Sequence, residues 1–303
     1  MEIFDILSPS GRENEMSEFI KKYAEDYGYR CRNDVFGNLI CEKGEKIKTA
    51  IECGIDNVSV MKTASDDNGM IKIAVPNSSE VKNLVGKKIR FLNGITGFVR
   101  CDKKDDITDF DLNADIGAQN KEEADEIVPV GEFATVVCDK TETEKFMFGN
   151  DIASYVPVLV LLECMKEVEN GAFLFTAQKK FAGRGLNALF EGYDVESVVS
   201  VNTLVEKNGI SCGNGAVVVV KEKGAVPTVS LRKDLIALAG EDVQLGATDE
   251  ALFLDLPMIS GKGALSGGVC IAIRGKGQMN EAVAKADIES AVKIISGYLK
   301  RGK

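Results

Sequence analysis

Two textures of apolar and polar positions alternate along the chain. Up to residue 62, and again from about residue 148, apolar runs of strand length alternate with stretches of helical period. The first such stretch follows Ser10, which has the spacing of a capping box with Glu13, so a helix is predicted to begin there and to end at Gly28. Its apolar residues at helical spacing are Met16, Phe19, Ile20 and Tyr23.

The other elements of this texture alternate between strand and helix. Strands are predicted at 29–33, 39–42, 49–53, 172–177, 197–203, 215–221, 242–245 and 269–274. Helices are predicted at 151–167, 183–190, 229–239 and 281–299, and the first of these is apolar almost all round, as a buried helix is. The alternation predicts an α/β fold with an open, mostly parallel sheet and helices on both faces.

Between residues 63 and 146 the pattern changes. Short β-type runs alternate with glycine and polar turns, and residues 121–126 have the pattern of a short helix. Such dense turn signals predict a small β-barrel or sandwich. We therefore expect an α/β domain made of residues 1–62 and 147–303, interrupted by an inserted β-barrel domain at 63–146.

Composition narrows the possible chemistry, because the 303 residues include no histidine. This excludes imidazole bases, Ser–His and Cys–His nucleophile pairs and histidine-ligated metal sites. The net charge of −10 argues against binding to nucleic acid or to an anionic membrane. Residues 59–62 match the Ser-x-x-Lys pattern of serine acyl-enzymes, but the partner motifs are missing and the match is expected by chance.

The eight cysteines are scattered without a Cys-x-x-Cys pair, which is typical of reduced, mostly buried thiols in a cytoplasmic protein. Glu2 and Asp5 precede any apolar stretch, so no secretory leader is predicted from these residues. The longest apolar run, 155–165, contains a proline and a glutamate and is too short to span a bilayer. We therefore expect a cytoplasmic protein.

Lys179 and Lys180 are a notable charged pair, because they follow a strongly apolar predicted strand. In open α/β sheets, ligands bind beyond the carboxyl ends of the strands. The two lysines are therefore candidates for binding an anion. An exposed pair without a ligand is an equally good interpretation of this pattern.

Several sequence blocks, in order along nearly the whole chain, resemble those of one family. The blocks are 7–13 (LSPSGRE), 36–40 (FGNLI), 111–118 (DLNADIGA), 121–124 (KEEA), 175–178 (FTAQ), 183–185 (GRG) and 246–249 (GATD). Together they resemble the glutamyl aminopeptidase and endoglucanase-M-like family of dinuclear metallo-aminopeptidases, the tetrahedral aminopeptidases. The resemblance implies a zinc-peptidase-like α/β domain with an inserted β-barrel dimerisation domain, two zinc or cobalt ions, and assembly into dimers or tetrahedral dodecamers.

The resemblance also implies that the family's metal-site positions are altered here. They are occupied by Gly54 (first histidine), Ala153 or Ser154 (bridging aspartate), Lys179 and Lys180 (adjacent glutamates, the base and a ligand), Asn202 (a later aspartate) and, approximately, Met279 (last histidine). The acidic residues expected to remain near the site are Asp56, Asp151 and Asp249. Charged lysine side chains only donate hydrogen bonds and cannot ligate a metal. We therefore predict no catalytic residue at these positions, and no metal or other cofactor.

The leading hypothesis is an aminopeptidase-family homologue with a degenerate metal site and no catalysis. Its partners would be a peptide or a small anion, further copies of itself, or an active paralogue. A second hypothesis is an active hydrolase with a rebuilt site, in which Asp56, Asp151 and Asp249 hold a metal or a lysine of lowered pKa acts as base. A third is a structural scaffold subunit without a ligand, and a filled rather than an open cleft would favour it.

Overall fold

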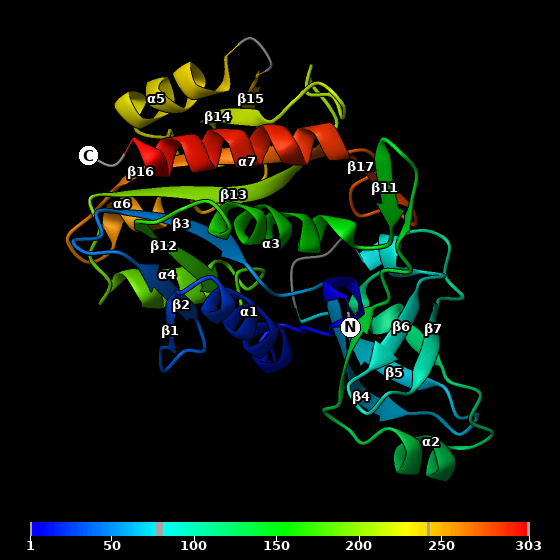
Figure 1. The fold of residues 1–303 in the computed structure, drawn as a ribbon. Coiled ribbons are helices and arrows are strands. Elements are labelled where there is room, and N and C mark those ends of the chain that lie inside the picture. Colours follow the sequence, from blue (N-terminus) through cyan, green and yellow to red (C-terminus); the bar gives the residue numbers. More distant parts are fainter. Residues whose placement is uncertain (1, 77–80, 241–242, 302–303) are drawn as a thin grey trace.

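The computed structural model describes residues 2–76, 81–240 and 243–301, and its largest feature is a mixed sheet (Figure 1). In order across the sheet, its strands are β1 (Arg30–Asn33), β2 (Leu39–Lys43), β12 (Gly171–Thr176), β3 (Thr49–Gly54), β13 (Ser197–Val205), β16 (Leu265–Ile273), β14 (Val217–Lys221) and β15 (Gln244–Ala247). The central strands β12, β3, β13 and β16 run parallel, so their carboxyl ends lie at one edge. β2 and β14 run antiparallel to this central group.

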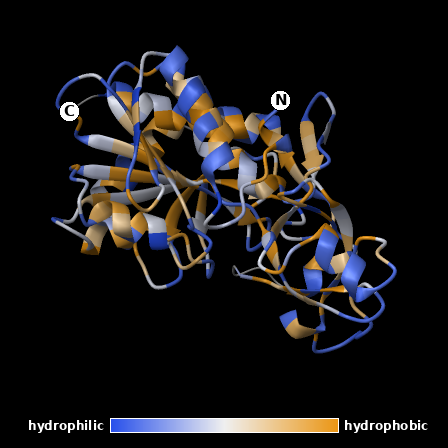
Figure 2. Ribbon diagram, turned by 90° about the horizontal axis from the view of Figure 1, so that it is seen from below, coloured by the Kyte–Doolittle hydropathy of each residue, from blue (hydrophilic) through white to orange (hydrophobic). Residues whose placement is uncertain are grey.

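Helices cover both faces of the sheet. The helices on one face are α1 (Asn14–Asp26), α3 (Ile152–Met165), α5 (Val229–Ala239) and α7 (Lys285–Lys300), and those on the other are α4 (Arg184–Phe190) and α6 (Leu256–Ile259). Successive side chains of a strand point to opposite faces, so Ile51 packs in the first core and Ala50 in the second. Figure 2 shows hydrophobic residues concentrated in these elements and hydrophilic residues in the bordering loops. The predicted α/β fold class is confirmed.

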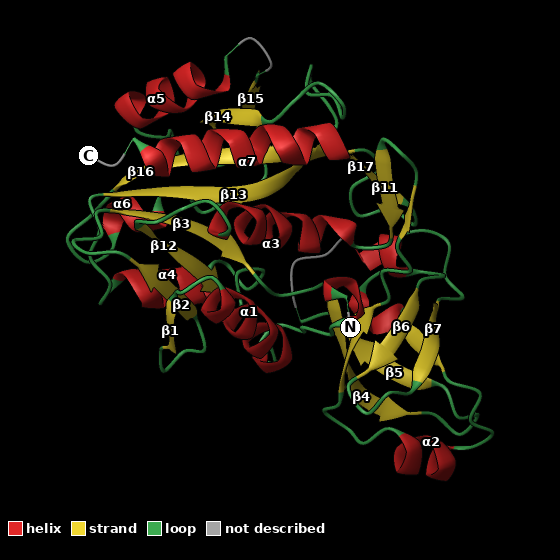
Figure 3. Cartoon of the chain, viewed as in Figure 1, coloured by secondary structure: helices red, strands yellow, loops and turns green. Residues whose placement is uncertain are grey.

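A closed barrel lies beside the sheet (Figure 3). In order around the barrel, its strands are β4 (Ser59–Ser65), β5 (Ile71–Ala74), β8 (Asn113–Asp115), β7 (Thr96–Arg100), β6 (Lys88–Phe91) and β9 (Phe133–Val136), and its helix is α2 (Lys121–Ile127). It has a hydrophobic core of its own, which includes Ile89 and Val99. The predicted barrel is therefore present. We propose that it forms the inserted domain, with a first strand that begins slightly before residue 63.

A small sheet connects the segment that leaves the barrel to the last helix. Its strands are β10 (Thr141–Glu142), β11 (Phe146–Gly149) and β17 (Glu281–Ala284). The helix predicted at 281–299 begins too early, because residues 281–284 form β17 and α7 begins only at Lys285. A local pattern could not show this, because the strand partner of β17 lies far away in sequence. The short 3-10 helices are Ile3–Asp5, Val81–Leu84 and Asp109–Asp111.

The predicted capping box before α1 was also wrong. The Ser10 hydroxyl donates to Asp56 Oδ2 at 2.6 Å, and α1 begins only at Asn14. The Glu13 carboxylate accepts from the backbone N–H groups of Gly11 and Gln178, both at 2.8 Å. Ser10 is thus engaged by a distant segment, and Glu13 by the nearby Gly11 and the distant Gln178, rather than by the first helical turn. Of the strand predicted at 242–245, residue 242 lies outside the described residues, and β15 begins at Gln244.

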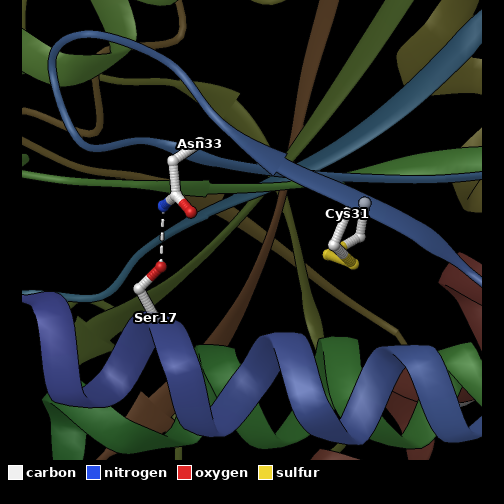
Figure 4. The surroundings of a disulfide bond; sticks show 4 residues. Ser17, Cys31 and Asn33 are labelled. Atoms are coloured by element: carbon white, nitrogen blue, oxygen red, sulfur yellow. Dashed lines mark hydrogen bonds between the residues drawn. A yellow bond between two sulfur atoms is a disulfide. The ribbon is translucent and has the colours of Figure 1, made fainter.

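A disulfide joins Cys31 to Cys41 (Figure 4), so the expectation of eight reduced thiols was wrong. The two residues lie directly opposite each other in the antiparallel hairpin of β1 and β2, with their Cα atoms 4.2 Å apart. On the same strand, Asn33 donates to Ser17 of α1 at 2.9 Å. The hairpin register, which the spacing of the cysteines does not reveal, brings the two sulfur atoms together.

Within the described ranges, no helix has both the length and the apolar character needed to cross a membrane.

Candidate functional site

The loop 177–183 follows β12 at the carboxyl edge of the parallel strands and carries both candidate lysines. The backbone N–H groups of residues 177, 178 and 180 donate to the side chains of Asn38, Glu13 and Asp56, at 2.9, 2.8 and 2.9 Å. All three acceptors are buried and come from different segments. The loop is therefore held in one conformation, which determines where its side chains lie.

Lys179 points from this loop into the sheet, where it forms a buried ion pair. Its Nζ lies 2.7 Å from Glu52 Oε2, and the two side chains are 8% and 0% exposed. The same Nζ donates to Ser200 Oγ at 3.1 Å. Thr176 Oγ1 donates to the other carboxylate oxygen, Glu52 Oε1, at 2.6 Å. The buried carboxylate is thus bonded by an ammonium group and by hydroxyls, as a buried charge requires.

Ser200 has no hydrogen-bonding capacity left for another partner. Its hydroxyl donates to Glu52 Oε2, and its oxygen accepts from Lys179 and from Asn202 Nδ2, the latter at 3.2 Å. A hydroxyl has one proton and two lone pairs, so all are used. Because Lys179 donates to Ser200 rather than accepting from it, the two are not arranged as a base and a nucleophile. We call Lys179, Glu52, Ser200, Thr176 and Asn202 the Lys179 cluster.

Gly54 lies beneath the stem of Lys179. A Cβ atom at position 54 would lie 2.8 Å from both Cβ and Cδ of Lys179, closer than real Cβ contacts come. No positive φ angle is recorded for Gly54, so the constraint is steric and comes from the lysine. A larger side chain at 54, such as the histidine expected from the resemblance, cannot coexist with Lys179 in this position.

A second buried group lies at the start of α3. Asp151 Oδ2 accepts from the Val58 N–H at 2.9 Å, and its Oδ1 accepts from Ser154 Oγ at 2.6 Å. Nearby, Glu281 accepts from the backbone N–H groups of Ala153 and Gly277, at 2.8 and 2.6 Å. Burial raises the pKa of the Asp151 carboxyl, and burial together with the charge of Asp151 raises the pKa of Glu281 to about 7.

Lys87 reaches this group from the barrel. It is 2% exposed, and its Nζ donates to the Gly277 carbonyl at 3.0 Å. Burial lowers the pKa of Lys87, while the charges of Asp151 and Glu281 oppose that shift. The charge of Lys180 opposes the rise in the pKa of Asp151. We call Asp151, Ser154, Glu281 and Lys87 the Asp151 cluster, and it lies where the barrel meets the α/β part.

The structure sorts the predicted site residues into these clusters and leaves some outside. The Lys179 cluster contains or borders Gly54, Lys179 and Asn202. The Asp151 cluster contains or borders Asp151, Ala153 and Ser154. Asp56 accepts a hydrogen bond from the backbone N–H of Lys180. Asp249 has a side chain that is 82% exposed and is paired with Lys207. Met279 is 46% exposed. Within the described residues, neither is seen to form a hydrogen bond or ion pair with either cluster.

These residues do not fit the two divalent ions that the resemblance implies. Such ions need several anionic oxygen or imidazole ligands with free lone pairs. Here Glu52 is paired with the Lys179 ammonium, while Asp56 accepts from Ser10 and a backbone N–H and Asp151 accepts from Ser154 and a backbone N–H. Among residues 2–76, 81–240 and 243–301, no three Cys, Asp or Glu side chains are grouped so that they could hold a metal ion.

Comparison with known proteins identifies the family. The model of the M42 glutamyl aminopeptidase family matches residues 37–294. The chain belongs to this family. A similar protein from Acetivibrio thermocellus, named provisionally as an aminopeptidase, is 25% identical over 316 residues, which cover 96% of this chain and 94% of that protein.

Solved structures of two peptidases and an endoglucanase have a similar fold. The TET aminopeptidase of a marine sediment archaeon of the Thaumarchaeota has a TM-score of 0.90 at 18% identity, over 99% of this chain and 94% of that one. The TET1 peptidase of Pyrococcus horikoshii, described as assembling into a tetrahedron or a large octahedral shell, has a TM-score of 0.85 at 22% identity, over 98% and 97%. An endoglucanase of Thermotoga maritima has a TM-score of 0.81 at 19% identity, over 99% and 96%.

Sequence reasoning missed the partners of the candidate lysines. Glu52 carried a usable signal, since it is the only charged residue in the apolar run 49–53 and a buried charge needs a partner. Ser200 carried none, because its role comes from lying opposite Glu52 in the register of β13 and β3. Lys87 and Glu281 are also joined only by the tertiary fold, across the barrel and the small sheet.

Proposed function

We propose that this M42 family member is non-catalytic and acts through assembly with itself or with a homologous chain. The observation that carries the proposal is the Lys179–Glu52 ion pair above Gly54. The lysine stem fills the space beside residue 54, and its ammonium group engages the buried carboxylate. Two of the three N–H donors of the Lys179 ammonium and the whole capacity of the Ser200 hydroxyl are directed at partners within the cluster, which argues against a role of either group in hydrolysis.

The rebuilt-site hypothesis receives less support from the same geometry. Asp249 is exposed and paired with Lys207, whereas Asp56 and Asp151 each accept two hydrogen bonds from the protein. Lys179 Nζ lies 2.7 Å from the Glu52 carboxylate and also contacts Ser200, so it is directed at protein partners on the sheet. We therefore assign neither an aspartate-held metal nor a lysine base to this chain.

Assembly is supported by the retained fold. The chain keeps both the sheet and the barrel of the solved TET peptidases over nearly their whole length, and one of these is described as a tetrahedral or octahedral shell. We infer that selection on this chain has preserved the scaffold while changing its site. Homo-oligomers are the expected form, and a mixed assembly with an active family member would use the same surfaces.

Metal analysis and aminopeptidase assays test the catalytic part of the proposal. The purified chain is measured for bound zinc and cobalt and assayed on aminoacyl substrates with each ion added, beside an active tetrahedral aminopeptidase as positive control. We expect no stoichiometric metal and no turnover above the buffer. A stoichiometric metal pair with metal-dependent turnover would overturn the proposal. Light scattering after gel filtration tests the assembly part, and a monomer at micromolar concentration would contradict it.

A further inference from the structure

Lys179 connects three neighbouring strands at their carboxyl ends. It follows β12 directly, its ammonium group binds Glu52 of β3 and Ser200 of β13, and these strands are adjacent in the sheet (Figure 1). Glu52 and Ser200 are partners in the register of β3 and β13, so their side chains project from the same face. One side chain thus links a loop to two parallel strands.

The charge of Glu52 makes this link necessary. The carboxylate is completely buried, and the charged group that contacts it is Lys179. Removing one partner of a buried ion pair leaves the other charge without compensation, and this is strongly destabilising. Replacing both partners by neutral groups of similar shape costs much less. The two charges therefore have a stabilising role only as a pair.

We propose that the Lys179 ammonium is a built-in structural cation of this fold: it supplies the positive charge required at the carboxyl edge of the sheet, so that the chain takes no cation from solution there. The proposal shares its geometry with the proposed function but concerns folding rather than activity. It also specifies a ligand class. If the lysine is cut back to its Cβ atom, the vacated space is lined by the Glu52 carboxylate and the Ser200 hydroxyl, which suit a primary alkylammonium ion.

Chemical rescue of Lys179→Ala tests the proposal. The variant lacks the atoms of propylammonium, from Cγ to Nζ, so propylammonium chloride is the probe, and thermal unfolding is the readout. We expect the substitution to lower Tm by about 10 °C. We also expect millimolar propylammonium to restore at least half of that loss, while leaving the Tm of the wild-type chain unchanged.

Two control compounds separate the charge from other effects. Propanol has a similar shape without the charge, and tetramethylammonium has the charge without an N–H donor. Neither should restore Tm. Rescue by propanol as strong as rescue by propylammonium, or a Lys179→Ala variant as stable as the wild type, would overturn the proposal.

A charge-neutral pair covers the case in which Lys179→Ala does not fold. The double variant Lys179→Met/Glu52→Gln keeps the volume and removes both charges, so its Tm should lie above that of Lys179→Met alone. A double variant no more stable than Lys179→Met would contradict the proposal. A chelator should not change the Tm of the wild type, and a loss of Tm on chelation would also contradict it.

None of these readouts depends on activity. Metal-dependent turnover by the wild type, with the rescue result intact, would overturn only the proposed function. Failure of the rescue, without turnover, would overturn only the structural cation.

Discussion

The Lys179 and Asp151 clusters differ in how their buried charges are compensated. In the first, one ammonium contacts one carboxylate inside a single sheet. In the second, two buried carboxyls receive mainly backbone N–H groups, and the Lys87 ammonium that attracts them is bonded to a backbone carbonyl. Direct pairing compensates the charge where it lies. In the Asp151 cluster, burial raises the pKa values of Asp151 and Glu281, and backbone N–H groups and Lys87 offset this only in part.

The two clusters differ in the partner of the buried carboxylate: Glu52 has a direct ammonium partner, whereas Asp151 and Glu281, whose pKa values are raised, accept mainly from backbone N–H groups. A pair formed within one sheet is fixed by strand register, whereas Lys87 reaches its carboxyls from the barrel. The Asp151 cluster should therefore respond to pH and to changes at the boundary between the two parts.

The largest expected effect that probes this contrast is that of Lys87→Met. Removing the barrel's ammonium leaves Asp151 and Glu281 with less compensation, so we expect the free energy of unfolding to fall by about 3 kcal/mol near pH 8. The loss should shrink near pH 5, where the Glu281 carboxyl is protonated. Urea unfolding at both pH values measures this difference. Equal losses at both would show that Lys87 acts by packing alone.

Glu281→Gln should remove much of the pH dependence. The folded pKa of Glu281 is raised to about 7 from an ordinary value of 4.5, so its contribution to stability is complete below pH 4.5 and is lost as the pH rises towards 7. The wild-type unfolding free energy should fall by up to about 1.4 kcal/mol per pH unit across this window. The variant should show a flatter profile.

The glutamine variant also has a constant cost. Glu281 accepts hydrogen bonds from two backbone N–H groups, whereas a glutamine has only one acceptor oxygen. The lost hydrogen bond should lower the free energy of unfolding by about 1 kcal/mol at acid pH. Chemical denaturation across the pH range separates the two effects. A profile parallel to that of the wild type would contradict the assignment to Glu281.

Gly54→Ala tests how tightly the Lys179 cluster is packed. The added methyl group collides with the lysine stem, so we expect a loss of about 2 kcal/mol in the free energy of unfolding. Gly192→Ala is the matched control, because a Cβ atom there would meet no neighbour within 4 Å. In a Lys179→Ala background the 2.8 Å approach to Cδ is removed but the 2.8 Å approach to Cβ remains, so the cost of Gly54→Ala should shrink without disappearing. Fully additive losses would argue against contact with the lysine stem.

The smallest effect expected is that of Ser200→Ala, about 1 kcal/mol. The change removes the hydroxyl that donates to Glu52 and accepts from Lys179. The matched control is Ser266→Ala, because Ser266 Oγ is buried and, among the described residues, has no hydrogen-bond partner. Thermal unfolding compares the two variants. Equal stability would show that the ion pair does not depend on the Ser200 hydroxyl.

Much of the fold could be predicted from the sequence because its elements have local signals. The apolar runs that became β3 and β12 and the helical period of α5 are readable in short windows. The position of Lys179 at the carboxyl end of β12 follows from the same reading. β17 and the Cys31–Cys41 disulfide were missed, because both depend on which strand pairs with which and in what register.

The residues of the candidate site were predictable only in part. Gly54 and the two lysines were identified from neighbouring residues, and their replacement chemistry follows from residue type. The other contacts of the site were not predictable from the sequence. Glu52 lies beside Ser200 because of parallel strand pairing, and Glu281 accepts from Ala153, which is 128 residues away in sequence. The sequence indicates which residues are candidates for the site, whereas the fold shows which side chains they contact.

The close contact between Gly54 and the Lys179 stem constrains the order in which this site can change during evolution. While the lysine lies above residue 54, any larger residue at 54 is penalised, whatever ligand it might offer. A histidine at position 54 would require that Lys179 be lost first, and losing Lys179 alone leaves the charge of Glu52 uncompensated. Each single substitution is therefore expected to destabilise the fold. The effects of substitutions at the two positions therefore depend on each other, and this epistasis favours retention of the present pair of residues.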